Sequence, residues 1–532
     1  MNNATQQLKR EIQRIRNETI GKYLSELTND SKTEYSLWKA TKRLKRPIAQ
    51  NPPIRNADRS WARNNLQKAC RFAEHLQMTF RPNDGDDLQD WNEPKQENII
   101  IRPTSLNEVY REIITNINEK KAPGFDLITG EILKQLPRKA IIKLTNIINA
   151  SFRLRHAPKM WKVGEVIMIP KPGKPPHEVS SYRPISLLPV VSKLFEKLLL
   201  KRLKPIIEEK NLIPSHQFGF RENHSTIDQI HRITNVIEKS LEEKKVCTTI
   251  FLDVAQAFDK VWHEGLFCKL KMFLPRQYSE LLISYLSERY FRIKQDDDYS
   301  ELKEIKAGVP QGSVLGPVLY LLYTSDIPDL DHNIMATFAD DTAIIAVGKN
   351  HEEAARKLQT SIDQINTWRK RWRIKLNESK SIHVNFTNKQ KQYIPIRIND
   401  TQIPHAESAK YLGMTLDAKL RWKVHVKKKR EELGIKYKNM YWMLGRHSKL
   451  SIYNKLLLYK QILKPVWTYG IQLWGCTSKS NIQVIQRFQN KVLKNIIGTA
   501  ESETSTGTLK WILLKKLYPN MPEVMNSDSF IT

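Results

Sequence analysis

The pattern of apolar and polar residues changes character along the chain. Near the N-terminus, Leu8, Ile12 and Ile15 recur at helical spacing among basic residues, and the helical pattern continues to about Phe80. Turn-forming and acidic residues then interrupt it over residues 81–98. Residues 1–98 are therefore predicted to be a helical N-terminal extension followed by a linker.

Helical segments alternate with proline-containing loops from Ile99 onward. The loops are expected at residues 121–126, 169–176 and 181–189, where prolines interrupt the helical pattern. Because strands and helices follow one another without regular β-α-β spacing, the predicted fold class is α+β and not a doubly wound sheet.

Three apolar segments in the middle of the chain predict strands and a buried helix. Residues 246–253 form a β-branched run ending at Asp253, which is typical of a buried strand, and a helix is expected to follow over residues 254–271. Residues 307–323 are typical of a turn that enters an apolar helix. Residues 335–347 predict two short strands around a tight acidic tip.

The last part of the chain is mostly helical and basic. In residues 481–498, one apolar stripe that includes Phe488 lies opposite a row of basic residues. That row is equally consistent with a solvated helix face and with a phosphate-binding surface. We predict a helical, basic segment over residues 426–500 and a polar tail over residues 501–532.

The charge of the chain indicates the kind of partner that it binds. Lys and Arg number 87 against 56 Asp and Glu, which gives a formal net charge of +31. Nucleic acid fits this excess best, because each neutralised phosphate releases a condensed counterion. An acidic membrane surface would attract the same charge, but no run approaches the roughly 18 apolar residues of a spanning helix. The N-terminus also lacks a secretory signal. We expect no membrane association and an intracellular location, in the nucleus or the cytoplasm.

Three acidic residues stand in apolar surroundings. Asp340 and Asp341 are adjacent between two hydrophobic runs, and Asp253 ends an apolar strand. Burial and mutual repulsion disfavour neighbouring carboxylates unless a cation binds them. Hard oxygen ligands that leave room for water and phosphate suit Mg²⁺ better than zinc. Two such ions about 3.5–4 Å apart would support nucleotidyl transfer. By itself an Asp-Asp pair is weak evidence, since most such pairs lie on protein surfaces.

Seven motifs follow one another along the chain. They are SYRPISLLPVVSKLFEKLL, QFGFRENHST, FLDVAQAFDKVWH, AGVPQGSVLGPVLY, FADD, WRIKLNESKS and YLGMTLD. In this order they resemble the reverse transcriptase blocks of non-LTR (LINE-like) retrotransposons, most of all the jockey type. The resemblance extends from about Tyr35 to about Ala500.

The resemblance implies a right-hand polymerase with fingers, a palm of antiparallel sheet and helices, and a helical thumb. It places an N-terminal extension of the fingers at residues 99–150, the fingers and palm at residues 151–425, and the thumb at residues 426–500. The implied reaction is RNA-directed DNA synthesis from a primer 3′-hydroxyl by two-metal nucleotidyl transfer. The implied partners are an RNA template, a DNA primer and dNTP substrates.

Site residues are carried over one at a time. The resemblance makes Asp253, Asp340 and Asp341 the catalytic carboxylates that bind two Mg²⁺ ions. Phe258 would exclude a ribose 2′-hydroxyl from beneath the incoming sugar, although a core aromatic on the helix after the strand would look the same. The nucleotide-binding residues implied are Lys171, Arg183, Phe258, Gln311 and Gly312, with Ser313 as a further candidate.

Further residues have more peripheral implied roles. Lys380 occupies the place of a proton donor to the leaving pyrophosphate. Arg221 is implied as a template or backbone contact. Tyr411, Leu412 and Gly413 match the hairpin that grips the primer, and an apolar hairpin between palm and thumb would look the same.

Two other features have alternative explanations. Trp368 and Trp372 could stack on bases, but their i, i+4 spacing is more typical of helix packing. The run KKKR at residues 427–430 could be a nuclear signal, although a solvated helix face is more common.

Full-length elements of this type carry an apurinic-like endonuclease before the polymerase, and this chain is expected to lack it. Either target nicking then comes from elsewhere, or the chain is a fragment or degraded copy. An RNA-dependent RNA polymerase would share the palm and metals, but Phe258 speaks against it. A catalytically silent nucleic-acid-binding remnant stays open as the alternative, and the intact aspartates favour the enzyme.

Overall fold

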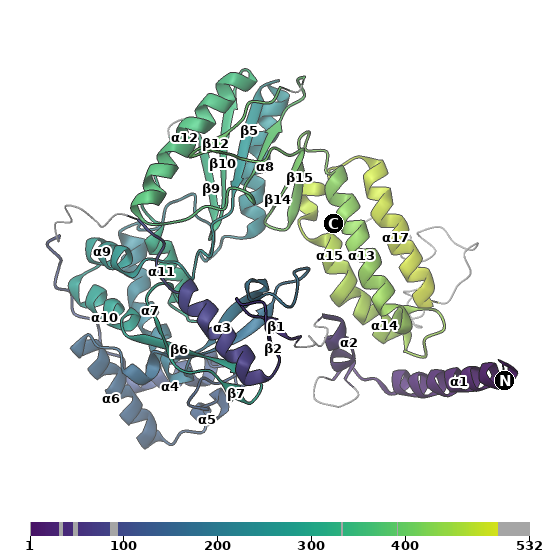
Figure 1. The fold of residues 1–532 in the computed structure, drawn as a ribbon, viewed down its shortest axis with the longest axis horizontal. Helices are drawn as coiled ribbons and strands as arrows, with labels where there is room; N and C mark the ends of the chain where they lie inside the picture. The colour runs from purple at the N-terminus through teal and green to yellow at the C-terminus, as the bar shows by residue number, and fades with distance from the viewer. Residues whose placement is uncertain are drawn as a thin grey trace, which may run out of the picture. The chain divides into compact units, whose positions relative to one another are not determined.

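The computed structural model describes residues 2–30, 36–45, 52–85, 94–330, 333–390 and 392–497. The chain forms two compact units, one of residues Gln50–Leu412 and one that combines Met1–Ala49 with Gly413–Thr532. The predicted polar tail at residues 501–532 lies outside the described residues. Figure 1 shows the elements of each unit.

The larger unit contains an antiparallel sheet with strand order β11-β5-β10-β9. All seven residues of the central strand β5 are buried, as its β-branched sequence predicts. The acidic hairpin is confirmed as two strands joined by a two-residue turn, with Asp341 paired to Phe338. The four strands are β5 (Val246–Leu252), β9 (Ile334–Phe338), β10 (Asp341–Gly348) and β11 (Ile382–Phe386).

Two helices pack against this sheet, α12 (His351–Arg371) and α8 (Thr226–Glu242). The residues Ile250 and Ile344 share one apolar core with Leu358 and Ile362 of α12. Burial of these side chains is what holds the sheet in place. The small strand β12 (Arg397–Ile398) lies beside α12 and pairs with β13 (Thr401–Gln402).

A second sheet has the strand order β4-β3-β6-β7, with β8 also paired to β6. The helix α3 (Asn65–Thr79) packs against it through Phe72, which contacts Tyr182 edge to face. The loop predicted at residues 181–189 is instead largely β4, and the start of the loop predicted at 169–176 is the end of β3. The strands are β3 (Val163–Pro170), β4 (Tyr182–Leu187), β6 (Arg289–Gln295), β7 (Asp298–Tyr299) and β8 (Lys303–Ile305).

The helical prediction for the first 80 residues is only partly correct. Residues 54–62 contain a two-stranded hairpin, β1 (Ile54–Arg55) and β2 (Trp61–Ala62), between the helices. No alternating apolar pattern signals strands that are only two residues long. The predicted helices are present as α1 (Asn2–Glu26), α2 (Leu37–Lys45) and α3.

The largest apolar core of the larger unit is helical. Leu194, Leu198 and Leu266 are among its fully buried members, together with Leu319 from the predicted apolar helix. The helices that contribute to it are α4 (Leu106–Asn116), α5 (Gly130–Lys134), α6 (Arg138–Leu154), α7 (Val190–Glu209), α9 (His263–Phe273), α10 (Arg276–Leu286) and α11 (Gly316–Tyr323). Short 3-10 turns lie at Lys159–Trp161 and Val179–Ser181.

In the described residues of the smaller unit, β15 (Met414–Asp417) is the one strand and the other elements are helices, as predicted for the basic C-terminal part of the chain. In α17, the predicted apolar stripe is buried at Ile485, Phe488 and Val492, whereas Ile482 is 40% exposed. A π-helical turn at Tyr459–Leu463 precedes Pro465, which lacks the N–H that a regular helix needs. The C-terminal helices are α13 (Lys423–Leu444), α14 (Ile452–Leu458), α15 (Lys464–Thr468), α16 (Ile471–Trp474) and α17 (Lys479–Ile497).

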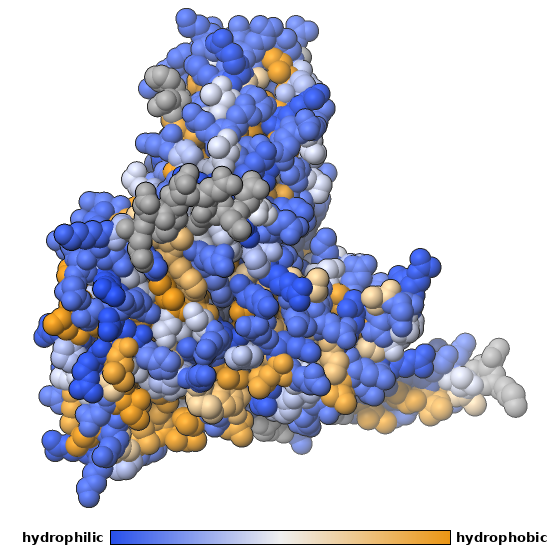
Figure 2. All heavy atoms as spheres, turned by 60° about the vertical axis from the view of Figure 1, so that its left-hand side comes forward, coloured by the Kyte–Doolittle hydropathy of each residue, from blue (hydrophilic) through white to orange (hydrophobic). Residues whose placement is uncertain are grey.

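The surface shown in Figure 2 is mostly hydrophilic, with apolar areas between the polar ones. In the part of the chain that the structure describes, no helix is both long enough and apolar enough to cross a membrane.

Candidate active site

The three predicted aspartates meet at one end of the central sheet. Asp253 directly follows β5, and Asp341 is the first residue of β10. The ladder between these strands ends with Thr342 opposite Leu252, so Asp253 and Asp341 occupy the next pair of positions. Asp340 lies in the turn between β9 and β10. The strand register thus brings together residues that are far apart in sequence.

The three carboxylates disfavour one another's charge. Burial, followed by the charges of Asp340 and Asp253, raises the pKa of Asp341 to about 6. The pKa of Asp340 is raised by burial and by Asp253. The nearest cation to Asp253 is Lys380, whose Nζ lies 3.7 Å from Asp253 Oδ2. A bound cation would relieve this repulsion.

The donor set is suited to a hard divalent cation whose coordination is completed by other molecules. Carboxylate oxygens are the protein ligands that such ions prefer. Among the described residues, no group of three or more His, Cys, Asp or Glu side chains is placed to hold a metal ion. An ion at Asp253 and Asp340 would therefore need further oxygens from water or a phosphate.

The acidic turn is held by Gln217 of the QFGFRENHST motif, a residue for which the sequence indicated no role. Gln217 Oε1 accepts hydrogen bonds from Ala339 N at 2.9 Å and from Gly219 N at 2.8 Å. Ala339, directly before Asp340, has a φ of 58°, which an L-residue rarely adopts. A Cβ at Gly219 would collide with the backbone nitrogen of Ala339. The QFGF motif therefore serves here to fix the hairpin tip.

The backbone of Asp253 is fixed from a different direction. Asn377 N donates to Asp253 O at 2.7 Å, and Ser381 Oγ accepts from Asp253 N at 3.2 Å. Both residues belong to the NESKS motif, which also carries Lys380. This motif thus anchors one carboxylate and places an ammonium group beside it.

A cleft of about 1210 Å³ opens beside the aspartates. It is large enough for a nucleotide and part of a nucleic acid strand. Its lining includes most of the predicted site residues, namely Lys171, Arg183, Asp253, Phe258, Gln311, Gly312, Ser313, Asp340 and Lys380.

Two basic residues face the cleft from the second sheet. Arg183 is an exposed residue of β4, and Lys171 follows β3, with its Nζ donating to Ser180 O at 2.7 Å. Burial and the positive charges of Arg183 and Lys380 lower the pKa of Lys171. The positive charge of Arg183 also lowers the pKa of Asp340, but burial raises that pKa by more. The cleft thus has a positive wall near the acidic hairpin.

Phe258 lines the cleft from a turn, so the prediction of a helix directly after β5 is wrong for residues 255–260. These residues form turns, and α9 begins only at His263. Gln256 has a φ of 50°, which is incompatible with a right-handed helix. The Phe258 ring stacks on Tyr320 with ring centroids 4.6 Å apart. It is therefore partly buried and partly open to the cleft.

Gly312 allows a close approach to the backbone of β4. Its φ is 117°, and a Cβ there would lie 2.6 Å from Ser186 O. Ser186 N in turn donates to Gln311 O at 2.9 Å. Ser313 Oγ accepts from Gly316 N at 2.8 Å, at the beginning of α11. The loop at residues 310–313 is thus joined to β4.

Other predicted residues do not line the cleft. Arg221 Nη1 donates to the carbonyls of Pro214 and Gln217 at 3.2 and 3.3 Å, so its guanidinium holds a loop. Tyr411 is 3% exposed, and its hydroxyl donates to Ala336 O at 3.2 Å. Leu412 and Gly413 form the turn after it, with φ values of 44° and 84°. The nucleic acid contacts expected of these four residues stay predictions.

The helix-packing interpretation of the two tryptophans is confirmed. Trp372 is 1% exposed, and Trp368 packs against the same helical core. Trp368 Nε1 donates to Asp326 Oδ1 at 2.8 Å. The buried Trp372 ring is therefore not free to stack on a base.

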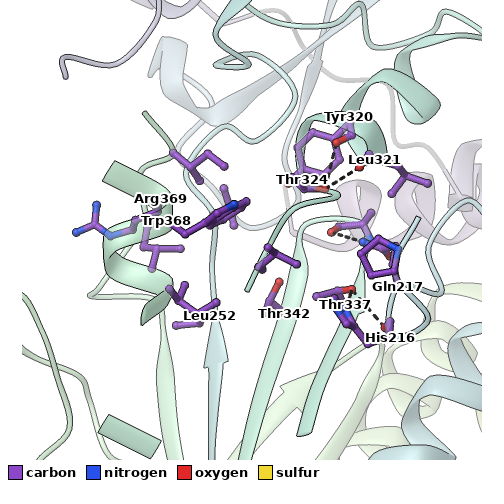
Figure 3. A pocket seen from close by; sticks show the side chains of 17 residues that line it. His216, Gln217, Leu252, Tyr320, Leu321, Thr324, Thr337, Thr342, Trp368 and Arg369 are labelled. Atoms are coloured by element: carbon purple, nitrogen blue, oxygen red, sulfur yellow. Dashed lines mark hydrogen bonds between the residues drawn. The ribbon is translucent and has the colours of Figure 1, made fainter. Parts of the chain in front are cut away.

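A small cavity lies behind the acidic hairpin. Its volume is about 40 Å³, which leaves room for only a few water molecules. Figure 3 shows Trp368, Thr342 and Thr324 entering it from three different elements, while the Arg369 side chain points away. The cavity is too small for a nucleotide, so the cleft is the candidate substrate site.

The sequence of this region matches a known family. Residues 169–416 match the model of the reverse transcriptase (RNA-dependent DNA polymerase) family. This span contains most of the cleft lining and all three aspartates, whereas α3, which also lines the cleft, lies outside it.

Known proteins are similar over most of the chain. In Drosophila melanogaster, the probable RNA-directed DNA polymerase from transposon X-element is 42% identical over 88% of this chain and 53% of its own length. The probable RNA-directed DNA polymerase from transposon BS is 38% identical over 93% of this chain and 56% of its own length. The RNA-directed DNA polymerase from mobile element jockey is 37% identical over 92% of this chain and 55% of its own.

The chain spans about half the length of these curated relatives. The family match and the similarity together cover the sheet, the cleft and the helices after them. Residues 169–416 form a reverse transcriptase domain, and the chain is similar over most of its length to the RNA-directed DNA polymerases of jockey and related transposons.

Proposed function

We propose that the chain is an RNA-directed DNA polymerase that extends a primer 3′-hydroxyl on an RNA template. The observation that carries this proposal is the meeting of Asp253, Asp340 and Asp341 at one sheet end, beside a cleft with a positive wall. The intact carboxylates favour this function over a silent nucleic-acid-binding remnant.

The carboxylates would hold two Mg²⁺ ions, with Asp253 and Asp340 as the main ligands. When bound, such ions activate the attacking hydroxyl and stabilise the charge of the leaving group. The fixed backbones of Ala339 and Asp253 keep the carboxylates in place, so that little reorganisation is needed on binding. Lys380, close to Asp253, is the proposed proton donor to the pyrophosphate.

The residues on the cleft walls are proposed to bind the incoming dNTP. Arg183 and Lys171 would grip the triphosphate, with forked donors and a point charge respectively. Phe258, held by its stacking on Tyr320, would lie beneath the sugar and exclude a 2′-hydroxyl. Gln311 and Gly312 would lie against the nucleotide and template backbone.

The larger domains are assigned on the same basis. We propose that the central sheet with α8 and α12 is the palm, the second sheet with α3 belongs to the fingers, and the helices of residues 426–500 form a thumb. Arg221 as a template contact, and Tyr411 to Gly413 as the primer grip, stay part of this proposal. The bonds of Arg221 and Tyr411 to backbone carbonyls support at least an indirect, loop-holding role for each.

Primer extension tests the proposed function. The purified chain with poly(rA), oligo(dT), dTTP and Mg²⁺ is expected to lengthen the primer, and reactions without template or without metal should not. A chain that binds the RNA but adds no nucleotide over a range of salt and divalent metal would instead be the silent remnant.

A further inference from the structure

Asp259 is a buried acid in the cleft that the proposed mechanism does not use. It is 8% exposed and lines the cleft close to Phe258. Its Oδ1 accepts a hydrogen bond from Gln311 Nε2 at 2.8 Å. Burial raises the pKa of Asp259 to about 7, while Gln311 and the charge of Lys171 act in the opposite direction. A buried carboxylate is costly, so its retention beside the site needs an explanation.

The backbones on both sides of this bond are already fixed. Val309 N donates to Phe258 O, and Gly308 N to Val261 O, both at 2.8 Å. Ser186 N donates to Gln311 O on the other side. Since these bonds already hold the two loops together, the Asp259 side chain is not needed for that purpose. What it does control is the side chain of Gln311.

At pH 8, above its pKa, the Asp259 carboxylate is ionised and can only accept hydrogen bonds, whereas an amide has one donor end and one acceptor end. Asp259 therefore forces the Gln311 amide to turn its N–H₂ inward. Gln311 Oε1 has no hydrogen-bond partner among the described residues, and Gln311 lines the cleft. The amide oxygen is thus available to a ligand there.

We propose that Asp259 is a positioning residue that orients the Gln311 amide, so that its oxygen accepts a hydrogen bond from the incoming deoxynucleoside triphosphate. This inference rests on the proposed polymerase function. It assigns to Asp259 a role in nucleotide binding that acts through another side chain. Asp259 itself does not touch the substrate.

Asp259→Asn tests this role with almost no change in shape. Asparagine can either accept from or donate to the Gln311 amide, so the fixed orientation is lost while a hydrogen bond is kept. In single-nucleotide addition at pH 8, KM for dTTP is expected to rise about tenfold, as for the loss of one well-placed hydrogen bond. kcat and the affinity for primer and template should stay within about twofold.

A double-mutant cycle separates positioning from a general structural role. Gln311→Ala should raise KM at least as much, and adding Asp259→Asn to it should have little further effect. The matched control is Asp363→Asn on α12, where an exposed aspartate also accepts from a glutamine amide, Gln359 Nε2, at 2.9 Å. This control should leave KM and kcat unchanged.

The outcomes are distinct. An unchanged KM in Asp259→Asn, or full additivity with Gln311→Ala, overturns the inference while the polymerase function stands. A fall in melting temperature together with weaker primer-template binding would also overturn it, since Asp259 would then act on the fold. A wild-type chain that never extends a primer overturns the proposed function itself, and with it this inference.

Discussion

Two clusters of charged side chains in the larger unit differ in how their charge is compensated. Lys269 on α9 is 0% exposed and donates to the Tyr323 carbonyl and to Asp326 Oδ1. Its ammonium also lies 3.7 Å from the centre of the Trp372 ring and 5.1 Å from that of Tyr323. This cation has an anion, a carbonyl and aromatic faces around it.

The acidic cluster at the end of the central sheet lacks such partners. Among the described residues, neither Asp340 nor Asp341 has a cation within ion-pair distance, and Lys380 beside Asp253 is itself 64% exposed. Burial and mutual repulsion keep the pKa values of Asp340 and Asp341 raised. The ammonium of Lys269 is fully occupied by its neighbours in the fold, whereas the carboxylates of the acidic cluster keep oxygens that a ligand can use.

The largest effect is expected from removing a carboxylate of the acidic cluster. Asp340→Asn should lower primer extension at least about a thousandfold, because one metal ligand is lost. RNA affinity should stay within about twofold, since it depends on the positive surfaces. Extension assays and fluorescence anisotropy measure the two quantities. Asp298→Asn on the exposed strand β7 is the control, and more than a tenth of wild-type extension in Asp340→Asn would contradict the assigned role.

A loss of stability is expected when the cluster around Lys269 is disrupted. Lys269→Met should lower the free energy of unfolding by about 3 kcal/mol, because Asp326 and the Tyr323 carbonyl lose their partner. Urea denaturation followed by tryptophan fluorescence measures this change. Lys239→Ala on the exposed face of α8 should cost less than about 0.5 kcal/mol. If both substitutions have equal effects, Lys269 is not a structural cation.

The pH dependence of stability sharpens the same contrast. Burial lowers the pKa of Lys269 to about 8 from 10.5. Between these values the unfolded chain binds more protons than the folded one, so stability rises with pH. The free energy of unfolding of the wild type, relative to Lys269→Met, should increase by up to about 3 kcal/mol from pH 8 to 10.5. Denaturation curves at several pH values measure it, and a flat difference would contradict the lowered pKa.

The smallest effect concerns metal binding to the folded chain. Adding Mg²⁺ at about ten times its dissociation constant should raise the free energy of unfolding by about 1.4 kcal/mol. The double variant Asp253→Asn/Asp340→Asn should lose this gain, whereas Lys269→Met should keep it. Thermal denaturation with and without the ion tests this, and an equal gain in the double variant would place the ion elsewhere.

Local sequence pattern predicted the central features well. The buried strand β5 and the acidic hairpin each depend on a continuous run of apolar residues, which a sequence displays directly. The turn at residues 255–260 was mistaken for a helix, because its apolar residues are compatible with helical spacing. Its backbone instead bonds to a loop some fifty residues later, as in the Val309 N to Phe258 O bond.

The residues that fix the acidic turn and the Gln311 side chain could not be found from local sequence pattern. Gln217 and Asp259 act on Ala339 and Gln311, which belong to distant segments. Nothing near Gln217 in sequence shows that its amide meets the acidic turn. Likewise, Pro184 made β4 look like a loop, although its place in the strand is paired with Met168.

The tight packing of Gly219 against Ala339, and of Gly312 against Ser186, bears on how the gene can decay. Any side chain at either position would displace the backbone that carries the acidic turn or Gln311. Copies that are no longer under selection acquire changes at these two codons as readily as elsewhere. Comparing the two codons across genomic copies therefore distinguishes elements that still need a working polymerase from inactive copies.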